Sequence, residues 1–272
     1  MQRNVDTSGL VLVTGGTGTL GRLVVDRLLA ADCSVRVQGR GPRVAAHGGD
    51  YVRADFATGE GVATALRGVS TVVHCAGSSR GDDHKARRMV HAAVQGGVRH
   101  IVNISVVGAG RVPVTSGVDR VMFGYYAAKA AAERAIIASG IPWSNLRATQ
   151  FHQLILTTVR GMSRVPVIPV PRFRFQPIDA AEVADRLVAL ACSAPAGAAG
   201  EMGGPRTYTM AELLRSYLHV TSRRRVLVPM SIPGNAARAL MDGANLSPQS
   251  ANGGRSWEDF LRARFNISME KT

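Results

Sequence analysis

The feature that most constrains the fold is a short apolar segment that runs into three evenly spaced glycines. Residues 10–13 are apolar and partly β-branched, and Gly15, Gly18 and Gly21 follow at intervals of three. Apolar side chains then recur on one helical face, at Leu20, Leu23, Val24 and Leu28. The pattern predicts a strand, a tight turn and a helix. The free backbone N–H groups at the start of such a helix attract a phosphate group.

Each glycine has a separate role in the expected phosphate site. Gly15 allows the tight turn, Gly18 lets the backbone approach a pyrophosphate, and Gly21 lets the helix pack close to the strand. The residues expected to line the site are Gly15, Thr17, Gly18, Thr19, Leu20 and Gly21. The alternative is an ordinary strand-to-helix turn that binds nothing. The apolar pattern on both sides of the turn favours the phosphate site.

Length and composition exclude several classes of protein. A chain of 272 residues with 46% hydrophobic residues fits one large α/β unit with a small appendage. It has no apolar run of about 20 residues and no apolar segment at its start, so we expect a cytoplasmic protein without membrane association. The net charge of +14 comes mostly from scattered arginines, because the lysines are only Lys85, Lys129 and Lys271. Nucleic acid is therefore the less favoured partner.

The cysteines and histidines do not form a recognisable site. Cys33, Cys75 and Cys192 lie far apart in mostly apolar surroundings and are interpreted as core residues. The seven histidines show no spacing with carboxylates that is typical of metal ligands. We therefore expect neither a disulfide framework nor a metal.

Strand and helix patterns alternate after the glycine turn. Strands are expected at 34–38, 50–56, 69–75 and 100–105, and helices at 59–66 and 84–95. Strands that are apolar in both directions need helices on both faces of their sheet. This half of the chain therefore predicts a doubly wound parallel sheet.

The ends of these strands carry residues that would select a dinucleotide. Arg40 follows the second strand, with Arg43 nearby, at the position where an acid selects NAD and a base selects NADP. Because a guanidinium can pair with a ribose 2′-phosphate, Arg40 favours NADP(H). Asp55 is expected to accept from the adenine amino group and Phe56 to pack at the ring edge; alternatively, Asp55 caps the following helix. The fourth strand ends in small residues where a cofactor would pass, namely Cys75, Ala76 and Gly77.

A tyrosine and a lysine at helical spacing form the candidate catalytic pair. Tyr125 and Lys129 are four residues apart, so they share one face of the helix that we expect to open at Tyr125. The lysine can donate to the nicotinamide ribose and lower the pKa of the tyrosine, which can then give a proton to a substrate oxygen. Ser105, at the end of the preceding strand, completes the candidate catalytic set.

These motifs together resemble the atypical short-chain dehydrogenase/reductases, and within them the NmrA-like NAD(P)-binding group. The segments that carry the resemblance are the glycine turn, Asp55-Phe56, 103–108, Tyr125 with Lys129, 139–151, 176–184, 203–205 and 257–261. The resemblance covers nearly the whole chain. It implies a Rossmann fold with a small C-terminal substrate lobe, Arg40 as the NADP-selecting residue, and Tyr125 with Lys129 as the catalytic pair.

Two positions depart from the pattern of this group. The usual Leu-Arg-Pro becomes Leu146-Arg147-Ala148. In related enzymes with a full catalytic triad the serine lies a residue or two beyond Ser105, where this chain has valines. Catalysis would then rest on Tyr125 and Lys129 without a serine.

Residues 1–150 are expected to form the dinucleotide-binding part and residues 151–272 a substrate-side lobe that is partly interleaved with it. Gln150, Phe151 and His152 are candidate substrate contacts; a satisfied buried pair or a helix cap explains the two polar residues equally well. The apolar residues expected around the substrate are Phe123, Phe151, Leu154 and Met162. A further strand is expected at 142–147, a strand with a lid-like loop at 165–175, and helices at 179–191 and from Thr209. Residues 224–230 and two further helices, at 235–241 and 256–264, are expected to form a small C-terminal lobe.

The sequence therefore predicts an NADPH-dependent reductase that acts on a carbonyl or conjugated bond of a small, apolar or aromatic substrate. One alternative is a regulator that binds NADP, senses redox state and does no chemistry. Another is a nucleotide-sugar epimerase or dehydratase, which shares the Tyr-xxx-Lys pattern. The sequence leaves a homodimer open.

Overall fold

The computed structural model describes residues 9–41, 49–77 and 82–267. Within them the chain divides into two compact units, each built from three segments. Unit 1 comprises the described residues up to Ser105, Gly124–Arg147 and Ala180–Gly200. Unit 2 comprises Val106–Phe123, Ala148–Asp179 and the described residues from Glu201 onward. The functional division at residue 150 stays a prediction.

A seven-stranded sheet has the order β3-β2-β1-β4-β5-β6-β9. Its strands are β1 (Leu10–Thr14), β2 (Val35–Gly39), β3 (Asp50–Arg53), β4 (Val69–His74), β5 (His100–Val106), β6 (Trp143–Ala148) and β9 (Gly197–Met202). The pairs from β3 through β5 are parallel. From β1 the chain adds β2 and β3 on one side and then β4, β5 and β6 on the other side. Parallel neighbours of this kind are joined by connections that cross a face of the sheet. The predicted doubly wound α/β fold is confirmed.

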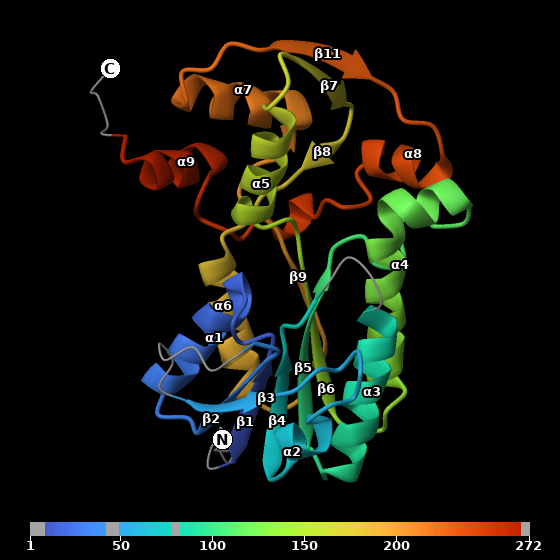
Figure 1. Cartoon of the computed structure of the whole chain (residues 1–272), viewed down its shortest axis with the longest axis vertical. Helices are drawn as coiled ribbons and strands as arrows, with labels where there is room; N and C mark the ends of the chain where they lie inside the picture. Colours follow the sequence, from blue (N-terminus) through green and yellow to red (C-terminus); the bar gives the residue numbers. More distant parts are fainter. Residues whose placement is uncertain (1–8, 42–48, 78–81, 268–272) are drawn as a thin grey trace. The chain divides into compact units, whose positions relative to one another are not determined.

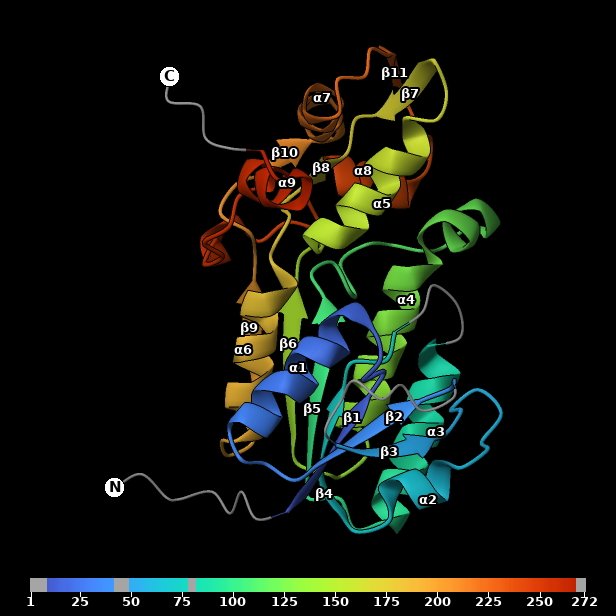
Figure 2. The same cartoon turned by 60° about the vertical axis from the view of Figure 1, so that its left-hand side comes forward.

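Helices cover both faces of this sheet, as the apolar strands require (Figure 1). On one face α1 (Thr19–Ala30) packs against α6 (Ala180–Ala191), and Figure 2 shows the two side by side. On the other face lie α2 (Val62–Leu66), α3 (Asp82–Gln95) and the lower part of α4 (Gly117–Ile137). The core on that side joins Leu12 and Ile101 of the sheet to Met89 and Ile136 of the helices. Burial of these side chains holds the carboxyl ends of the strands in place.

Several elements differ from expectation. The helix with the Tyr-Lys pair begins at Gly117, not at Tyr125. The backbone N–H of Asp119 donates to the Ser116 hydroxyl at 3.0 Å, and that of Ser116 donates to the Asp119 carboxylate at 3.1 Å, a reciprocal cap that starts the helix early. The third strand ends at Arg53, and the helix after it begins only at Val62. The edge strand β9 was not expected.

Unit 2 contains α5 (His152–Met162), β7 (Val167–Pro171), β8 (Arg174–Phe175), β10 (Tyr208–Thr209), α7 (Met210–Val220), β11 (Val226–Met230), α8 (Asn235–Met241), a 3₁₀ turn (Pro248–Ser250) and α9 (Trp257–Phe265). Strands β8 and β10 pair antiparallel, and β7 and β11 pair parallel. The core of unit 2 surrounds the fully buried Trp257. The predicted capping box at Thr209 is confirmed, and Ser256 caps α9.

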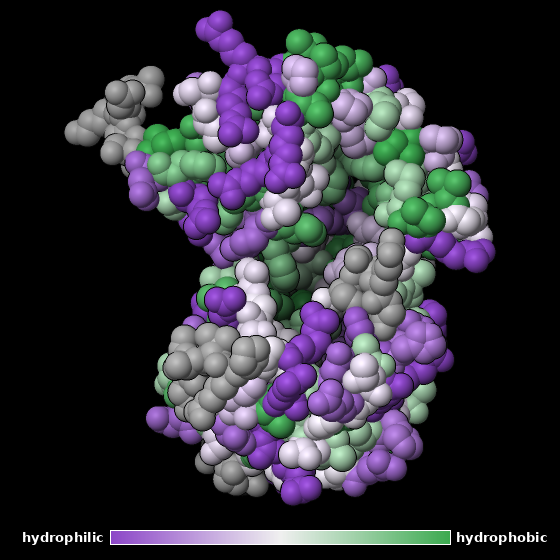
Figure 3. Space-filling model, in the orientation of Figure 1, coloured by the Kyte–Doolittle hydropathy of each residue, from purple (hydrophilic) through white to green (hydrophobic). Residues whose placement is uncertain are grey.

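The outer side of β11 is apolar and exposed. Val226, Val228 and Met230 are among the exposed large apolar residues of the chain, and Figure 3 shows apolar surface at this strand. Leu227, between them, packs instead against the core of unit 2. Within the three described ranges, no helix has the length and apolar character needed to cross a membrane.

Candidate cofactor and active site

The glycine turn connects β1 to α1 and requires glycine at two positions. Gly15 has φ +64°, and a Cβ on it would lie 2.8 Å from the Cα of Ala76. A Cβ on Gly21 would lie 2.2 Å from the carbonyl oxygen of Gly15. The turn is closed by the N–H of Gly18, which donates to that same oxygen at 2.9 Å. Helix α1 then begins at Thr19 without a side-chain cap, which leaves its N-terminus open to an anion.

Gln38 fixes this turn from the neighbouring strand β2. Its side-chain oxygen accepts from the N–H of Gly15 at 3.0 Å, and its side-chain nitrogen donates to the carbonyl oxygen of Ala54. The backbone oxygen of Gln38 accepts from Gly16 at 3.2 Å. Gln38 is 3% exposed, so its amide group is shielded from water. Its hydrogen bonds within the protein replace those that it would make with water in the unfolded chain. Sequence reasoning missed this residue, although a glutamine among strand valines is itself a signal.

A cavity of about 230 Å³ opens beside the turn. The residues that line it are Gly15, Thr17, Gly18, Gln38, Gly39, Arg40, Asp55, Phe56, Cys75, Ala76, Gly77 and Lys85. The predicted cofactor residues of four strand ends thus meet at one place, while Thr19, Leu20 and Gly21 form the first turn of α1. Lys85 of α3 also lines the cavity, so the cavity has two cationic side chains, Arg40 and Lys85. The sequence did not predict Lys85 as a cofactor residue. Arg43 lies outside the described residues.

Asp55 and Phe56 line the cavity but also hold the chain after β3. The carboxylate of Asp55 accepts from the N–H of Ala57 at 2.7 Å, which closes the turn. Helix α2 is preceded by Gly61 and has no side-chain cap, so Asp55 does not cap it. Phe56 is 4% exposed and packs in the core of unit 1. Both residues are thereby held rigidly at the cavity.

The ends of β1 and β4 are joined by a buried polar contact. The hydroxyl of Thr14 lies 2.8 Å from Nδ1 of His74 and accepts from the N–H of Ala76 at 3.3 Å. Burial, followed by the charge of Lys129, lowers the pKa of His74 to about 3. Burial raises the pKa of Cys75 to about 12, against the opposing charge of Lys129. Lys129 therefore lies close enough to the end of β4 to act on both groups.

Tyr125 and Lys129 are neighbours on α4, as their spacing predicts. The Nζ atom of Lys129 lies 5.9 Å from the centroid of the Tyr125 ring. Lys129 is 5% exposed, whereas Tyr125 is half-buried. The adjacent Tyr126 packs edge-to-face on Tyr125, and burial raises its pKa to about 12. The ammonium group of Lys129 therefore lies near the ring of Tyr125, the candidate proton donor, and acts on the two residues at the end of β4.

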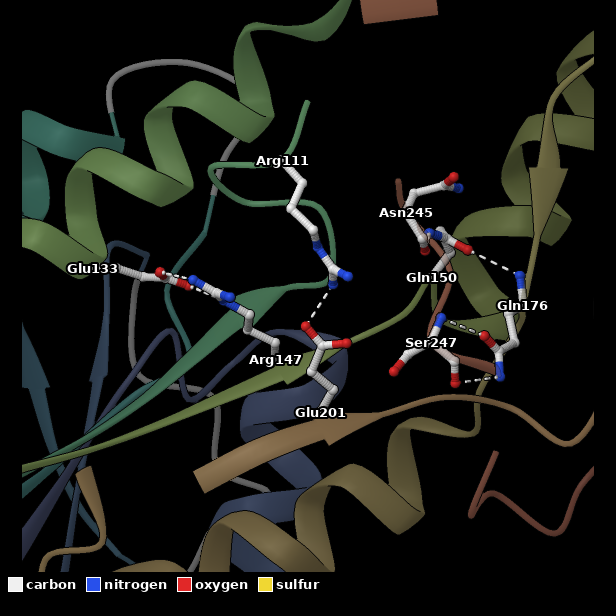
Figure 4. A network of polar contacts seen from close by, with 8 residues as sticks. All are labelled: Arg111, Glu133, Arg147, Gln150, Gln176, Glu201, Asn245 and Ser247. Carbon is white, nitrogen blue, oxygen red and sulfur yellow. Dashed lines mark hydrogen bonds and ion pairs between the residues drawn. The ribbon is translucent and has the colours of Figure 1, made fainter. Parts of the chain in front are cut away.

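Ser105 is buried in a polar cluster between the sheet and α4. Arg147 donates two hydrogen bonds to Glu133, at 2.9 and 2.6 Å (Figure 4). Burial acts to raise the pKa of Glu133, but the hydrogen bonds and the charge of Arg147 help to hold it below its usual range. Ser105 itself is 2% exposed. Its hydroxyl oxygen has no hydrogen-bond partner among the described residues. The pairing of Arg147 with Glu133 explains the arginine of the Leu-Arg-Ala segment.

Gln150 belongs to a network inside unit 2 (Figure 4). Its side-chain nitrogen donates to the carbonyl oxygen of Asn245 at 3.1 Å, and its side-chain oxygen accepts from the N–H of Gln176 at 3.1 Å. The side chain of Gln176 in turn exchanges two hydrogen bonds with the backbone of Ser247. This network ties the segment before α5 to the segment after α8.

The other candidate substrate residues lie at and around α5. His152 is fully buried, its ring stacks 4.9 Å from that of Phe260, and burial lowers its pKa to about 4. Phe151 is half-buried just before the helix. Leu154 is 55% exposed, whereas Met162 packs against the core of unit 2. Phe123 packs edge-to-face on Phe173.

No group of three or more His, Cys, Asp or Glu side chains is placed to hold a metal ion within the described part of the chain.

Comparison with known proteins relates this site to reductases. The chain is 28% identical over 222 residues to a (4-alkanoyl-5-oxo-2,5-dihydrofuran-3-yl)methyl phosphate reductase from Streptomyces griseus, covering 79% of this chain and 74% of that protein. It is 29% identical over 259 residues to a ceramide reductase from Caulobacter vibrioides, covering 87% and 78%. Both relatives are reductases by name, in agreement with the expected oxidoreductase class.

A solved structure shares the fold. The NADPH-dependent quinone oxidoreductase of Escherichia coli in complex with NADPH superposes with a TM-score of 0.75 at 18% identity, over 94% of this chain and 100% of that one. The family model for NAD(P)H-binding proteins matches residues 15–192, which include the glycine turn, the cavity and the Tyr-Lys pair. The chain belongs to the NAD(P)H-binding family.

Proposed function

We propose that this protein is an NADPH-dependent reductase that acts on a carbonyl group or a conjugated double bond of a small, largely apolar substrate. The observation that carries the proposal is the position of Lys129. Its buried ammonium group lies beside the ring of Tyr125 and acts on His74 and Cys75 at the end of β4. Cys75 also lines the cavity at the glycine turn. The proposed proton donor and the proposed dinucleotide site therefore belong to the same compact unit.

The residues at the cavity fit NADPH. Its pyrophosphate would rest on the glycine turn and the open N-terminus of α1, where a Cβ at Gly15 or Gly21 would clash with backbone. Arg40 and Lys85 line the cavity and would supply positive charge for the phosphates, and Arg40 is proposed to select the 2′-phosphate. When bound, NADPH supplies the hydride for the reduction.

Tyr125 is the proposed general acid. Its hydroxyl would hold the proton that the substrate oxygen receives, and the adjacent charge of Lys129 stabilises the phenolate that remains. Ser105 is proposed to position the pair from the end of β5, because its side chain is buried near Glu133 of helix α4. In the proposed reaction Tyr125 and Lys129 act without a serine at the substrate oxygen.

The class of substrate is proposed from the relatives. Their names describe the reduction of a dihydrofuranone phosphate ester and of ceramide, and the structural neighbour is named for quinones. Among the candidate substrate residues, Phe151 is the proposed contact, because it is half-buried and apolar. Gln150 and His152, which are engaged inside unit 2, are proposed to hold Phe151 in position.

The proposal is tested by measuring NADPH binding from cofactor fluorescence and then NADPH oxidation with a panel of quinones, dihydrofuranones, long-chain ketones and a UDP-sugar. We expect tight NADPH binding and consumption that matches the amount of reduced product from at least one apolar carbonyl compound. Tight binding with no turnover on the panel would support the NADP-binding regulator instead. Isomerisation of the UDP-sugar without net consumption of NADPH would support an epimerase.

A further inference from the structure

Two cysteines that are far apart in sequence lie together in unit 1. Cys33 follows the end of α1 and Cys192 follows the end of α6. These two helices pack against each other on one face of the sheet (Figures 1 and 2). Both cysteines line one cavity of about 280 Å³, together with Val11, Ser70 and His100. The cavity is separate from the one at the glycine turn, whose lining residues are different.

Backbone hydrogen bonds hold both cysteines at the ends of their helices. Asp32 adopts φ +55°, which ends α1, and the N–H of Cys33 donates to the carbonyl oxygen of Leu28 at 3.0 Å. The N–H of Cys192 donates to the carbonyl oxygen of Val188 at 3.0 Å and so continues the pattern of α6. Both residues are therefore held by backbone hydrogen bonds, and each helix end presents its thiol to the same cavity.

The two thiols also interact with each other. Burial, followed by the neighbouring Cys33 thiol, raises the pKa of Cys192 to about 11, and a side-chain hydrogen bond between the two thiols contributes to this rise. Both cysteines are free thiols, as is Cys75. Two neighbouring thiols at the ends of two packed helices are candidates for a disulfide.

We propose that Cys33 and Cys192 form an oxidisable dithiol, which closes to an intramolecular disulfide when a small disulfide compound enters the cavity. One thiolate attacks the small disulfide, forms a mixed disulfide and releases one small thiol. The second cysteine attacks the protein sulfur of that mixed disulfide and releases the other small thiol. The two protein thiols lose two electrons and two protons, and the small disulfide is reduced to two thiols.

The disulfide would join the end of α1 to the end of α6. Because it closes a loop of well over 100 residues, it restricts the unfolded chain strongly and raises the midpoint of thermal unfolding. The rate should rise with pH, because the raised pKa of Cys192 leaves little thiolate near neutrality. Cys75 lines the other cavity and serves as an internal control.

The test incubates the folded protein with oxidised glutathione at pH 7 and pH 9, quenches with acid, alkylates free thiols and maps the peptides by mass spectrometry. We expect a cross-linked peptide pair that contains Cys33 and Cys192, faster formation at pH 9, and alkylated Cys75. The unfolding midpoint should rise by about 5 °C or more and return after reduction with dithiothreitol.

Cys33→Ser and Cys192→Ser should each remove both the cross-link and the rise in the unfolding midpoint. Recovery of both cysteines as alkylated thiols from the oxidised wild-type protein would overturn the proposal. So would a glutathione adduct on one cysteine without a cross-link, or a disulfide between two chains on a non-reducing gel. Peptide mapping of the oxidised wild-type protein tests for the Cys33–Cys192 disulfide even if a serine variant folds poorly.

Discussion

Arg40 is the side chain on which the choice between NADPH and NADH is expected to depend. It lines the cavity at the end of β2, where its guanidinium can pair with a ribose 2′-phosphate. Arg40→Ala should weaken NADPH binding about 10- to 100-fold, the effect of losing a hydrogen bond to a charged group, and change NADH binding little. Fluorescence titration with both cofactors measures this. Equal weakening of the two would refute the 2′-phosphate assignment.

Gln38→Leu is the matched control for Arg40→Ala, because the hydrogen bonds of the Gln38 side chain go to the backbone of Gly15 and Ala54. Gln38→Leu removes the acceptor for Gly15 and the donor for Ala54, both in a buried place. We expect NADPH and NADH to weaken by a similar factor and the free energy of unfolding to fall by about 1–3 kcal/mol. A variant that binds both cofactors as the wild type does would show that Gln38 does not hold the turn.

Among the helices of unit 2, α7 depends on the capping box that begins it. The hydroxyl of Thr209 accepts from the N–H of Glu212 at 3.2 Å, and the carboxylate of Glu212 accepts from the N–H of Thr209 at 2.7 Å. Thr209→Ala should lower the free energy of unfolding by about 1 kcal/mol. Urea denaturation measures this, with Thr207→Ala, outside the helix start, as the control. Equal losses in the two variants would contradict a specific capping effect.

Most strands and helices could be predicted because their apolar side chains follow a clear period. The edge strand β9 could not, because its Gly-Ala-Ala-Gly-Glu-Met sequence lacks the large apolar side chains that mark a strand. The start of α4 was missed for a related reason: Val118, Val121 and Met122 are exposed there, so no buried face reveals the helix. The reciprocal cap of Ser116 and Asp119 was the only local signal.

The candidate site was predictable where it depends on local motifs. The glycine turn, Arg40 and the Tyr-Lys pair each follow from neighbouring residues in the chain. Gln38, Lys85 and the contact between Cys33 and Cys192 instead depend on the register of parallel strands and on how helices pack. A single sequence contains no direct signal for such contacts between distant segments.

For the chain as a whole, buried neutral histidines should make stability fall in acid. Burial lowers the pKa of His74 to about 3 and that of His100 and His152 to about 4, whereas an unfolded histidine titrates near 6.5. Between these values the unfolded chain binds protons that the folded chain does not. Stability is therefore full above about pH 6.5 and is lost as the pH falls toward 4.

Each of these histidines should cost roughly 2 kcal/mol of stability at pH 5, at about 1.4 kcal/mol per pH unit. Thermal unfolding at a series of pH values measures the loss, and His152→Phe should reduce its slope below pH 6.5. An unfolding midpoint that is the same at pH 7 and pH 5 would contradict this account of the buried histidines.

The central claim is that Tyr125, beside Lys129 and the NADPH cavity, gives the proton in a reduction. The most direct measurement compares kcat and the NADPH dissociation constant of Tyr125→Phe with those of Tyr126→Phe, on a substrate that the wild type reduces. We predict that Tyr125→Phe lowers kcat by about 100-fold or more with NADPH affinity unchanged, and that the adjacent Tyr126→Phe retains turnover. Equal kcat values for the two variants would contradict the claim.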